Sequence, residues 1–183
     1  MARIADLNFR KNLWKWGQSA QAVMKNLLRH VDIVIANEED IQLSLGIAAG
    51  ADVHAGKLDP RCYESLTNAV LSQYSNLKAI AVTMRESKNA NVNCWSAALN
   101  GRHGFEVSRS YEITDIVDRA GSGDSFAAGL IWGIQASGIG REALEFATAA
   151  SCLKHSIPGD YNRVTVDEVQ HLLANGGSGR VQR

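Results

Sequence analysis

Two short apolar runs constrain the fold of this chain more than any other feature. Residues 32–36 and 78–83 are rich in Ile, Val and Ala, a composition typical of strands covered on both faces of a parallel sheet. Each run follows a segment in which apolar residues recur at helical spacing, over residues 14–30 and 60–76. Because helices and buried strands alternate along the chain, we expect an α/β fold with a mostly parallel sheet.

Capping residues indicate where other helices begin. Asn37 is a favourable N-cap, and the acidic residues 38–40 that follow it complement the helix dipole, so we expect a helix that ends near Gly46. Thr165 and Glu168 have the spacing of a capping box and predict a last amphipathic helix.

The middle of the chain has a different pattern. Residues 92–99 and 105–107 flank the dipeptide Asn100-Gly101, which favours a tight type I′ turn, so we expect a β-hairpin here. Residues 111–117 are expected to add one more strand.

Two segments in the second half are apolar around most of their circumference. Residues 126–136 and 141–154 are therefore expected to be buried helices that cover the sheet. The last residues, 175–183, are rich in Gly and predict a flexible tail.

Length and composition exclude several classes of function. The chain has 183 residues, with 19 basic and 19 acidic side chains and a net charge of +0, so it lacks the basic excess that nucleic acid or an anionic membrane requires. No apolar run approaches the ~20 residues of a membrane-spanning helix, and the first residues lack the apolar core of a secretory signal. The three cysteines form no CxxC pair and predict neither a disulfide framework nor a zinc site. We expect a soluble, cytoplasmic protein with no nucleic-acid or membrane partner.

The residues that carry chemistry lie in the sequence DRAGSGDSF, residues 118–126, between a strand pattern and an apolar helix. Glycines at the start of a helix let the backbone approach a ligand, and free N–H groups there bind a phosphate-like anion. We call Gly121, Ser122 and Gly123 the anion-hole turn. Asp124 lies beside this turn and could remove the proton of an attacking hydroxyl group. This combination is typical of phosphoryl transfer.

A purely structural interpretation of the same residues stays open, in which the glycines form a tight turn and Asp124 complements the helix dipole. Two other phosphate-binding motifs are excluded by their spacing. The chain has no GxxxxGK[ST] sequence, and the turn lacks the third glycine of the dinucleotide fingerprint.

Residues 118–129 resemble the C-terminal signature of the ribokinase-like (PfkB) carbohydrate kinases. The resemblance implies a three-layer α/β/α fold in which the anion-hole turn holds the phosphoryl group and Asp124 is the catalytic base, with a further place against the substrate. It also implies that the backbone oxygens of Asp118 and Ala120 contact a monovalent cation such as K⁺.

Two more segments are similar to elements of this family. Residues 6–10, DLNFR, are similar to the DxNxR element of members related to fructokinase and 2-keto-3-deoxygluconate kinase, which makes Arg10 the candidate contact to the substrate. Asn37 resembles the first residue of the NxxE element, which lies near the nucleotide phosphates and Mg²⁺. Asp40 stands where Glu is usual, and its shorter side chain implies an indirect role at the metal.

The resemblance also assigns nucleotide contacts. Thr83 begins the segment that usually lies along the nucleotide phosphates, and Arg85 could supply a phosphate contact there. Residues 154–160 correspond to a segment beside the adenine, which makes His155 a candidate wall of the purine site. Residues 8–14 and 154–160 look more like 2-keto-3-deoxygluconate kinases than like ribokinases or adenosine kinases.

The resemblance covers nearly all of residues 5–173 but begins in the middle of the family pattern. We therefore expect residues 1–174 to be the C-terminal part of a kinase domain whose N-terminal half and lid are missing, which leaves an unpaired strand edge. The family implies ATP and Mg²⁺, a small sugar or sugar acid as substrate, and a homo-oligomer in the complete enzyme. Three interpretations stay open: a 2-dehydro-3-deoxygluconate kinase, a fructokinase-like sugar kinase, or a non-catalytic remnant that binds a nucleotide or a partner.

Overall fold

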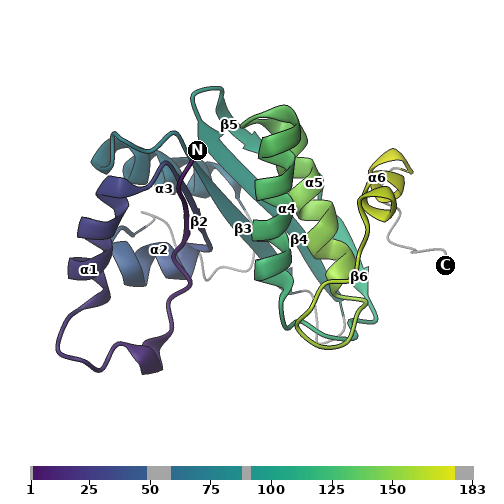
Figure 1. Ribbon diagram of the computed structural model, residues 1–183, viewed down its shortest axis with the longest axis horizontal. Coiled ribbons are helices and arrows are strands. Elements are labelled where there is room, and N and C mark those ends of the chain that lie inside the picture. Colours follow the sequence, from purple (N-terminus) through teal and green to yellow (C-terminus); the bar gives the residue numbers. More distant parts are fainter. Residues whose placement is uncertain (1, 49–58, 88–91, 176–183) are drawn as a thin grey trace. The chain divides into compact units, whose positions relative to one another are not determined.

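The computed structural model describes residues 2–48, 59–87 and 92–175 (Figure 1). Two compact units are present. The first takes its residues from Met1–Thr83 and Ala98–Phe105, and the second from Met84–Ala97 and Glu106–Arg183.

The described strands form one mixed sheet. They are β1 (Ile4–Asp6), β2 (Ile33–Ala36), β3 (Ala79–Ser87), β4 (Val92–Gly101), β5 (Gly104–Val107) and β6 (Tyr111–Thr114). Their order is β1-β2-β3-β4-β5, and β6 pairs with β4. The first three strands are parallel, whereas β4 and β6 are antiparallel. Both apolar runs lie in this sheet, as β2 and as the first half of β3, and every residue of β2 is buried.

One carboxylate joins the starts of the three parallel strands. Asp32 Oδ2 accepts a hydrogen bond from the backbone N–H of Arg3 at 2.9 Å, and Asp32 Oδ1 lies 3.0 Å from Lys78 Nζ. The backbone N–H of Lys78 also donates to the carbonyl oxygen of Asp32 at 2.7 Å. The Asp32 side chain is only 14% exposed, so these contacts fix the register of the strands from one partly buried position.

Three α-helices belong to the first unit: α1 (Ala20–Leu27), α2 (Glu38–Leu45) and α3 (Pro60–Gln73). The prediction of one helix over residues 14–30 is wrong at its start. Gly17 has φ +90°, which a helix does not allow, and Ser19 caps α1 by accepting a hydrogen bond from Ala22 N at 3.2 Å. The 3₁₀ turns η1 (Lys11–Leu13) and η2 (Leu28–His30) flank this helix.

The hairpin of β4 and β5 is confirmed, but its turn is not at Asn100-Gly101. Both residues belong to β4, and the chain turns at residues 102–103. The Asn100 side chain is buried and donates to Thr67 Oγ1 at 2.9 Å and to Asn68 Oδ1 at 2.8 Å. A β-carbon on Gly101 would lie 2.8 Å from the carbonyl oxygen of Lys78, so glycine is needed for close strand packing.

Helices α4 (Ser122–Ser137), α5 (Arg141–Lys154) and α6 (Val166–Ala174) belong to the second unit. A β-carbon on Gly129 would lie 2.9 Å from Ala147 Cα, and one on Gly133 would lie 2.7 Å from Ala143 Cα, so α4 and α5 lie antiparallel with their backbones almost in contact (Figure 1). The core beside them consists of Trp95, Tyr111, Ile113, Phe146, Ala149, Ala150, Leu153 and Val169.

The predicted boundaries of two elements of this unit, α6 and β6, are confirmed only in part. The capping box of α6 is confirmed, with the Glu168 carboxylate 2.8 Å from Thr165 N. Strand β6 ends at Thr114 rather than at residue 117, because Asp115 has φ +55°. Residues 176–183 of the predicted tail lie outside the described residues.

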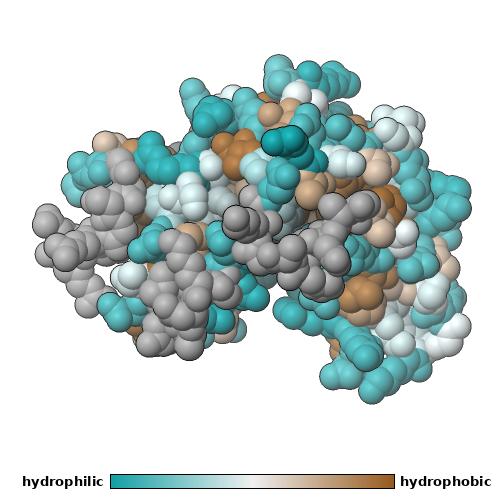
Figure 2. Space-filling view, turned by 180° about the vertical axis from the view of Figure 1, so that it is seen from behind, coloured by the Kyte–Doolittle hydropathy of each residue, from teal (hydrophilic) through white to brown (hydrophobic). Residues whose placement is uncertain are grey.

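The surface seen in Figure 2 is mainly hydrophilic, with hydrophobic side chains in separate patches. Among the described residues, no helix combines the length and the apolar character needed to cross a membrane.

Candidate functional site

The anion-hole turn begins helix α4. Gly121 is the N-cap residue, in the left-handed conformation with φ +74°, and no side chain caps the helix. The N–H groups of Ser122 and Ser125 donate to the backbone oxygens of Arg119 and Gly121, at 3.3 and 2.9 Å. Those of Gly123 and Asp124 have no hydrogen-bond acceptor among the described residues. A β-carbon on Gly123 would point into open space. Two free donors and room for close approach therefore fit a phosphate-like anion.

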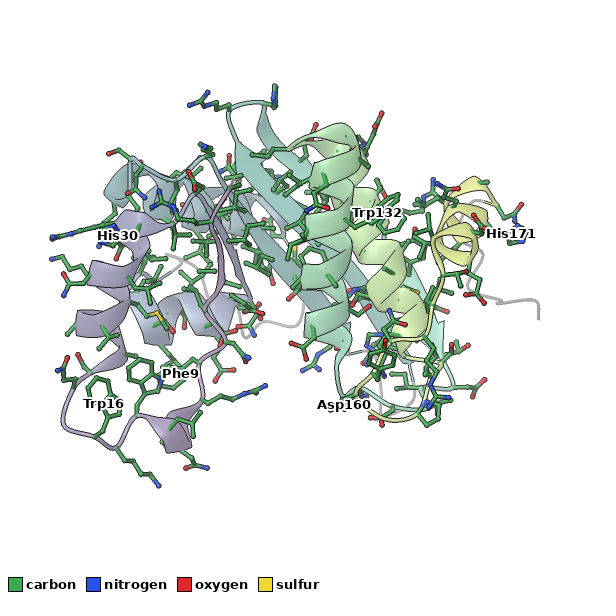
Figure 3. All side chains as sticks on the ribbon, in the orientation of Figure 1. Phe9, Trp16, His30, Trp132, Asp160 and His171 are labelled. Carbon is green, nitrogen blue, oxygen red and sulfur yellow. The ribbon has the colours of Figure 1, made fainter. Side chains whose placement is uncertain are left out.

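The loop of residues 157–162 lies directly against this turn. A β-carbon on Gly121 would overlap the carbonyl oxygen of Asp160, which Figure 3 labels beside the N-terminal end of α4. The Asp118 carboxylate connects the two segments, because it accepts from Ala120 N at 2.9 Å and from Gly159 N at 2.8 Å. These two hydrogen bonds hold the pKa of Asp118 below its usual value, and the one from Ala120 has the larger effect.

Three polar side chains attach the turn to helix α5. Ser151 Oγ donates to the carbonyl oxygen of Ser122 at 2.7 Å, and Ser125 Oγ donates to that of Ala150 at 3.1 Å. Asn162 Nδ2 donates to Ser125 Oγ at 2.5 Å and lies 3.4 Å from the oxygen of Ala150. Ser125 and Ser151 are 4% and 0% exposed. Sequence reasoning missed these residues, since isolated polar side chains carry no signal of their long-range partners.

Asp124 lies in the first turn of α4 and is exposed. No described residue donates a hydrogen bond to its carboxylate, so the group can accept a proton from a bound hydroxyl. Its place in the first turn of α4 agrees with the sequence analysis, and its role as a base stays a prediction.

His155 is 2% exposed, and its ring packs against Trp95 with 5.2 Å between ring centres. Its Nδ1 lies 2.9 Å from the carbonyl oxygen of Ser151, and its own carbonyl oxygen accepts from the N–H groups of Val117 and Asp118 at 2.9 and 3.3 Å. Burial is the main reason that the pKa of His155 is lowered. The contact to a purine stays a prediction, and the burial of the ring argues against it.

The candidate cation contacts are main-chain atoms. The carbonyl oxygens of Asp118 and Ala120 accept no hydrogen bond from the described residues, and they stand in the segment that the Asp118 carboxylate holds. The described residues contain no group of three or more His, Cys, Asp or Glu side chains that could hold a metal ion.

The remaining predicted side chains lie at the ends of β1 and β2. Asn37 caps α2, because its Oδ1 accepts from Asp40 N at 2.7 Å. Asp40 Oδ1 accepts from the backbone N–H of Phe9 at 2.8 Å, which brings Asp40 next to the DxNxR segment. Burial raises the pKa of Asp40, while the Phe9 hydrogen bond and the charge of Arg10 oppose this shift. The Arg10 side chain is exposed.

Thr83 and Arg85 lie two positions apart on β3 and therefore point to the same face of that strand, with Thr83 half-buried and Arg85 exposed. Within the first unit the structure brings together Asp40, Asn37 and the Arg10 segment. Within the second it brings together Asp118, Ala120, the anion-hole turn, Asp124 and the loop after His155.

Comparison with known proteins gives consistent results. A sequence model of the pfkB family of carbohydrate kinases matches residues 1–165. A 2-dehydro-3-deoxygalactonokinase from Haloferax volcanii is 30% identical over 175 residues, which are 95% of this chain and 48% of that protein. The chain therefore spans about half the length of this curated relative.

Solved structures agree with this match. A 2-dehydro-3-deoxygluconokinase from Thermotoga maritima is 40% identical with a TM-score of 0.83, and the match covers 93% of this chain and 50% of that one. A PfkB family carbohydrate kinase from Listeria grayi is 28% identical with a TM-score of 0.75, over 93% of this chain and 49% of that one. The ribokinase-like α/β fold expected from the sequence is confirmed.

Proposed function

Because the chain belongs to the pfkB family of carbohydrate kinases, we propose that it carries the phosphate-binding and catalytic part of an ATP-dependent kinase for a 2-keto-3-deoxy sugar acid, most closely 2-dehydro-3-deoxygluconate. The observation that carries this proposal is the first turn of α4. There, the free N–H groups of Gly123 and Asp124 lie beside an exposed carboxylate. The names of the Haloferax and Thermotoga relatives support the substrate class.

The proposed reaction is a direct phosphoryl transfer. The Asp124 carboxylate takes the proton of a substrate hydroxyl, whose oxygen then bonds to the γ-phosphorus of ATP while the bond to the β–γ bridging oxygen breaks. Negative charge develops on the transferring group, and the N–H groups of Gly123 and Asp124 donate to it. The products are ADP and a phosphate ester, and the proton stays on Asp124 until solvent removes it.

Mg²⁺ supplies charge neutralisation on the nucleotide phosphates when it is bound. Such an ion is usually held by one or two carboxylates, phosphate oxygens and water rather than by a dedicated cluster. The described residues contain no such cluster, and Asp40, the acidic side chain at the start of α2 that the family resemblance points to, already accepts the Phe9 N–H with its Oδ1. The backbone oxygens of Asp118 and Ala120 are the proposed contacts of a monovalent cation. Asn37, Thr83 and Arg85 are the proposed contacts on the nucleotide side.

Arg10 supports a sugar acid over a neutral sugar. Its guanidinium group is exposed and can pair with a carboxylate through two parallel hydrogen bonds. A neutral hexose such as fructose has no carboxylate to form such a pair. The fructokinase-like alternative is therefore tested by substrate preference.

The test uses a fusion of this chain to the part of the Thermotoga enzyme that the match leaves uncovered, with ADP release as the readout. We expect turnover with 2-keto-3-deoxygluconate in preference to fructose. Asp124→Asn should lower kcat by about 10²–10⁴-fold and leave ATP affinity nearly unchanged. Asp115→Asn is the matched control and should keep full turnover.

Other outcomes decide between the alternatives. Equal turnover of the Asp124→Asn fusion would remove Asp124 as the base. A fusion that binds ATP in calorimetry but phosphorylates neither substrate would identify the chain as a nucleotide-binding remnant. The same calorimetry on the 183-residue chain shows whether this part binds ATP by itself.

A further inference from the structure

We propose that Asp40 is a positioning residue for the substrate-binding segment Leu7–Arg10, and that it acts by accepting the Phe9 N–H rather than by contributing charge to a metal site. The functional part of this inference rests on the proposed function, because it requires that Arg10 contacts the sugar acid. The structural part does not.

The segment after β1 is attached to the rest of the first unit at few points. Leu7 N donates to the carbonyl oxygen of Ile35 at 3.0 Å, which is the last backbone bond between this segment and β2. The next residue, Asn8, has φ +32° and turns the chain away from the sheet. After this turn, the next hydrogen bond from the segment to another element is that of Phe9 N to Asp40 Oδ1, at 2.8 Å.

Asp40 is held in place by its own helix. It is the third residue of α2, and its N–H donates to the capping oxygen of Asn37 at 2.7 Å. In α6 the residue at the same position, Glu168, folds back onto the N–H of the capping residue at 2.8 Å. The side chain of Asp40 is one methylene shorter. The Asn37 N–H still helps to lower its pKa, but its Oδ1 accepts from Phe9 N, 31 positions earlier in the chain. The cap that starts α2 thus also fixes the backbone next to Arg10.

The other contacts described for this segment are local. Phe9 stacks on Trp14, with 6.4 Å between ring centres and 6° between planes, and Trp14 continues the stack to Trp16 (Figure 3). The Arg10 carbonyl oxygen accepts from Leu13 N at 2.8 Å. These contacts lie within residues 9–16, so they keep the local shape of the loop but do not attach it to α2. The hydrogen bond from Phe9 N to Asp40 Oδ1 does attach it to α2.

Two pairs of variants separate the acceptor from the charge. Asp40→Asn removes the charge and keeps an oxygen that can accept from Phe9 N, whereas Asp40→Ala removes both. Glu39→Gln and Glu39→Ala change the neighbouring, exposed acid of the same helical turn and control for the loss of charge near the helix N-terminus.

The first readout needs no activity. Amide exchange of Phe9, followed by ¹⁵N NMR on the 183-residue chain, should accelerate by about tenfold or more in Asp40→Ala and by less than about threefold in Asp40→Asn, because a hydrogen bond to this oxygen is lost only in the first. Both Glu39 variants should exchange like the wild type. Equal exchange of Phe9 in Asp40→Ala and wild type would overturn the proposal.

The second readout uses the fusion described above. Asp40→Ala should raise KM for the sugar acid by about tenfold, with kcat and the half-saturating Mg²⁺ concentration nearly unchanged, and Asp40→Asn should stay within about threefold of wild type. If Asp40→Asn instead raises the half-saturating Mg²⁺ concentration as much as Asp40→Ala, the charge matters and the proposal is wrong. A wild-type fusion without turnover refutes the proposed function, whereas the exchange experiment still decides the role of Asp40.

Discussion

Gly121 and the carbonyl oxygen of Asp160 lie so close together that a β-carbon on residue 121 would overlap that oxygen. The left-handed backbone of Gly121, with φ +74°, adds a second reason for glycine at this position. Gly123, in the same turn, has neither restriction, since its missing β-carbon faces open space. The two glycines of the motif therefore have different surroundings: the backbone of the Asp160 loop lies against Gly121, and open space lies in front of Gly123.

This difference gives the first prediction. Gly121→Ala should lower the free energy of unfolding by at least about 2 kcal/mol, because alanine meets both an unfavourable φ and a steric overlap. Gly123→Ala should keep or slightly raise stability, by about 0.5–1 kcal/mol, and should weaken ATP binding, because its methyl group fills the space in front of the free N–H groups. Urea unfolding and calorimetry measure the two effects. Wild-type ATP affinity in Gly123→Ala would place the anion elsewhere.

The second prediction concerns acid stability. The Arg3 N–H and the Lys78 ammonium group hold the pKa of Asp32 well below its usual range. The stabilisation from Asp32 is therefore complete above the unfolded-state pKa of about 3.9 and is lost as the pH falls below it. We expect Tm to fall between pH 5 and pH 2, and to fall less steeply in Asp32→Asn. Asp167→Asn, which changes an exposed acid of α6, is the control and should follow the wild type. Parallel Tm curves for wild type and Asp32→Asn would contradict this role.

The third prediction concerns Asn162, whose amide reaches both Ser125 Oγ and the Ala150 carbonyl oxygen. Asn162→Ala should destabilise the protein by about 1–3 kcal/mol, because Ser125 Oγ loses a buried partner. It should also weaken ATP binding, since Ser125 lies one residue after Asp124 in the first turn of α4. Asn175→Ala removes an exposed hydrogen bond to His171 and should change neither quantity. An unchanged unfolding free energy for Asn162→Ala would show that this contact does not hold the turn.

Local chemistry made much of the fold predictable. The caps at Asn37 and Thr165 are confirmed, because side-chain capping depends on residues within one helical turn. The start of α1 was harder to predict from the sequence. Apolar residues continue before this helix at Trp14 and Trp16, which stack on each other in a loop. The Ser19 cap was the signal that would have corrected it.

The features that could not be predicted from the sequence depend on contacts between residues far apart in the chain. Asn100 and Gly101 look like a turn in isolation, but a buried partner at Thr67 and the close approach of Lys78 keep them in a strand. At the candidate site, the turn and the neighbouring Asp124 follow from one short motif. The hydrogen bonds from Ser151 and Asn162 that hold this segment join residues far apart in the sequence. Such pairs cannot be predicted from the residues next to them.

The glycine contacts between α4 and α5 bear on how this site can respond to a ligand. Gly129 packs against Ala147 and Gly133 against Ala143, with only alanine methyl groups between the two helix backbones, so we expect α4 to have little freedom to move relative to α5. If a ligand changes the conformation of the anion-hole turn, we expect the chain before Gly121 and the loop around Asp160 to move rather than α4. A methyl group added at Gly133 would overlap Ala143 and push the two helices apart, so it is expected to shift the first turn of α4 without contacting the candidate site.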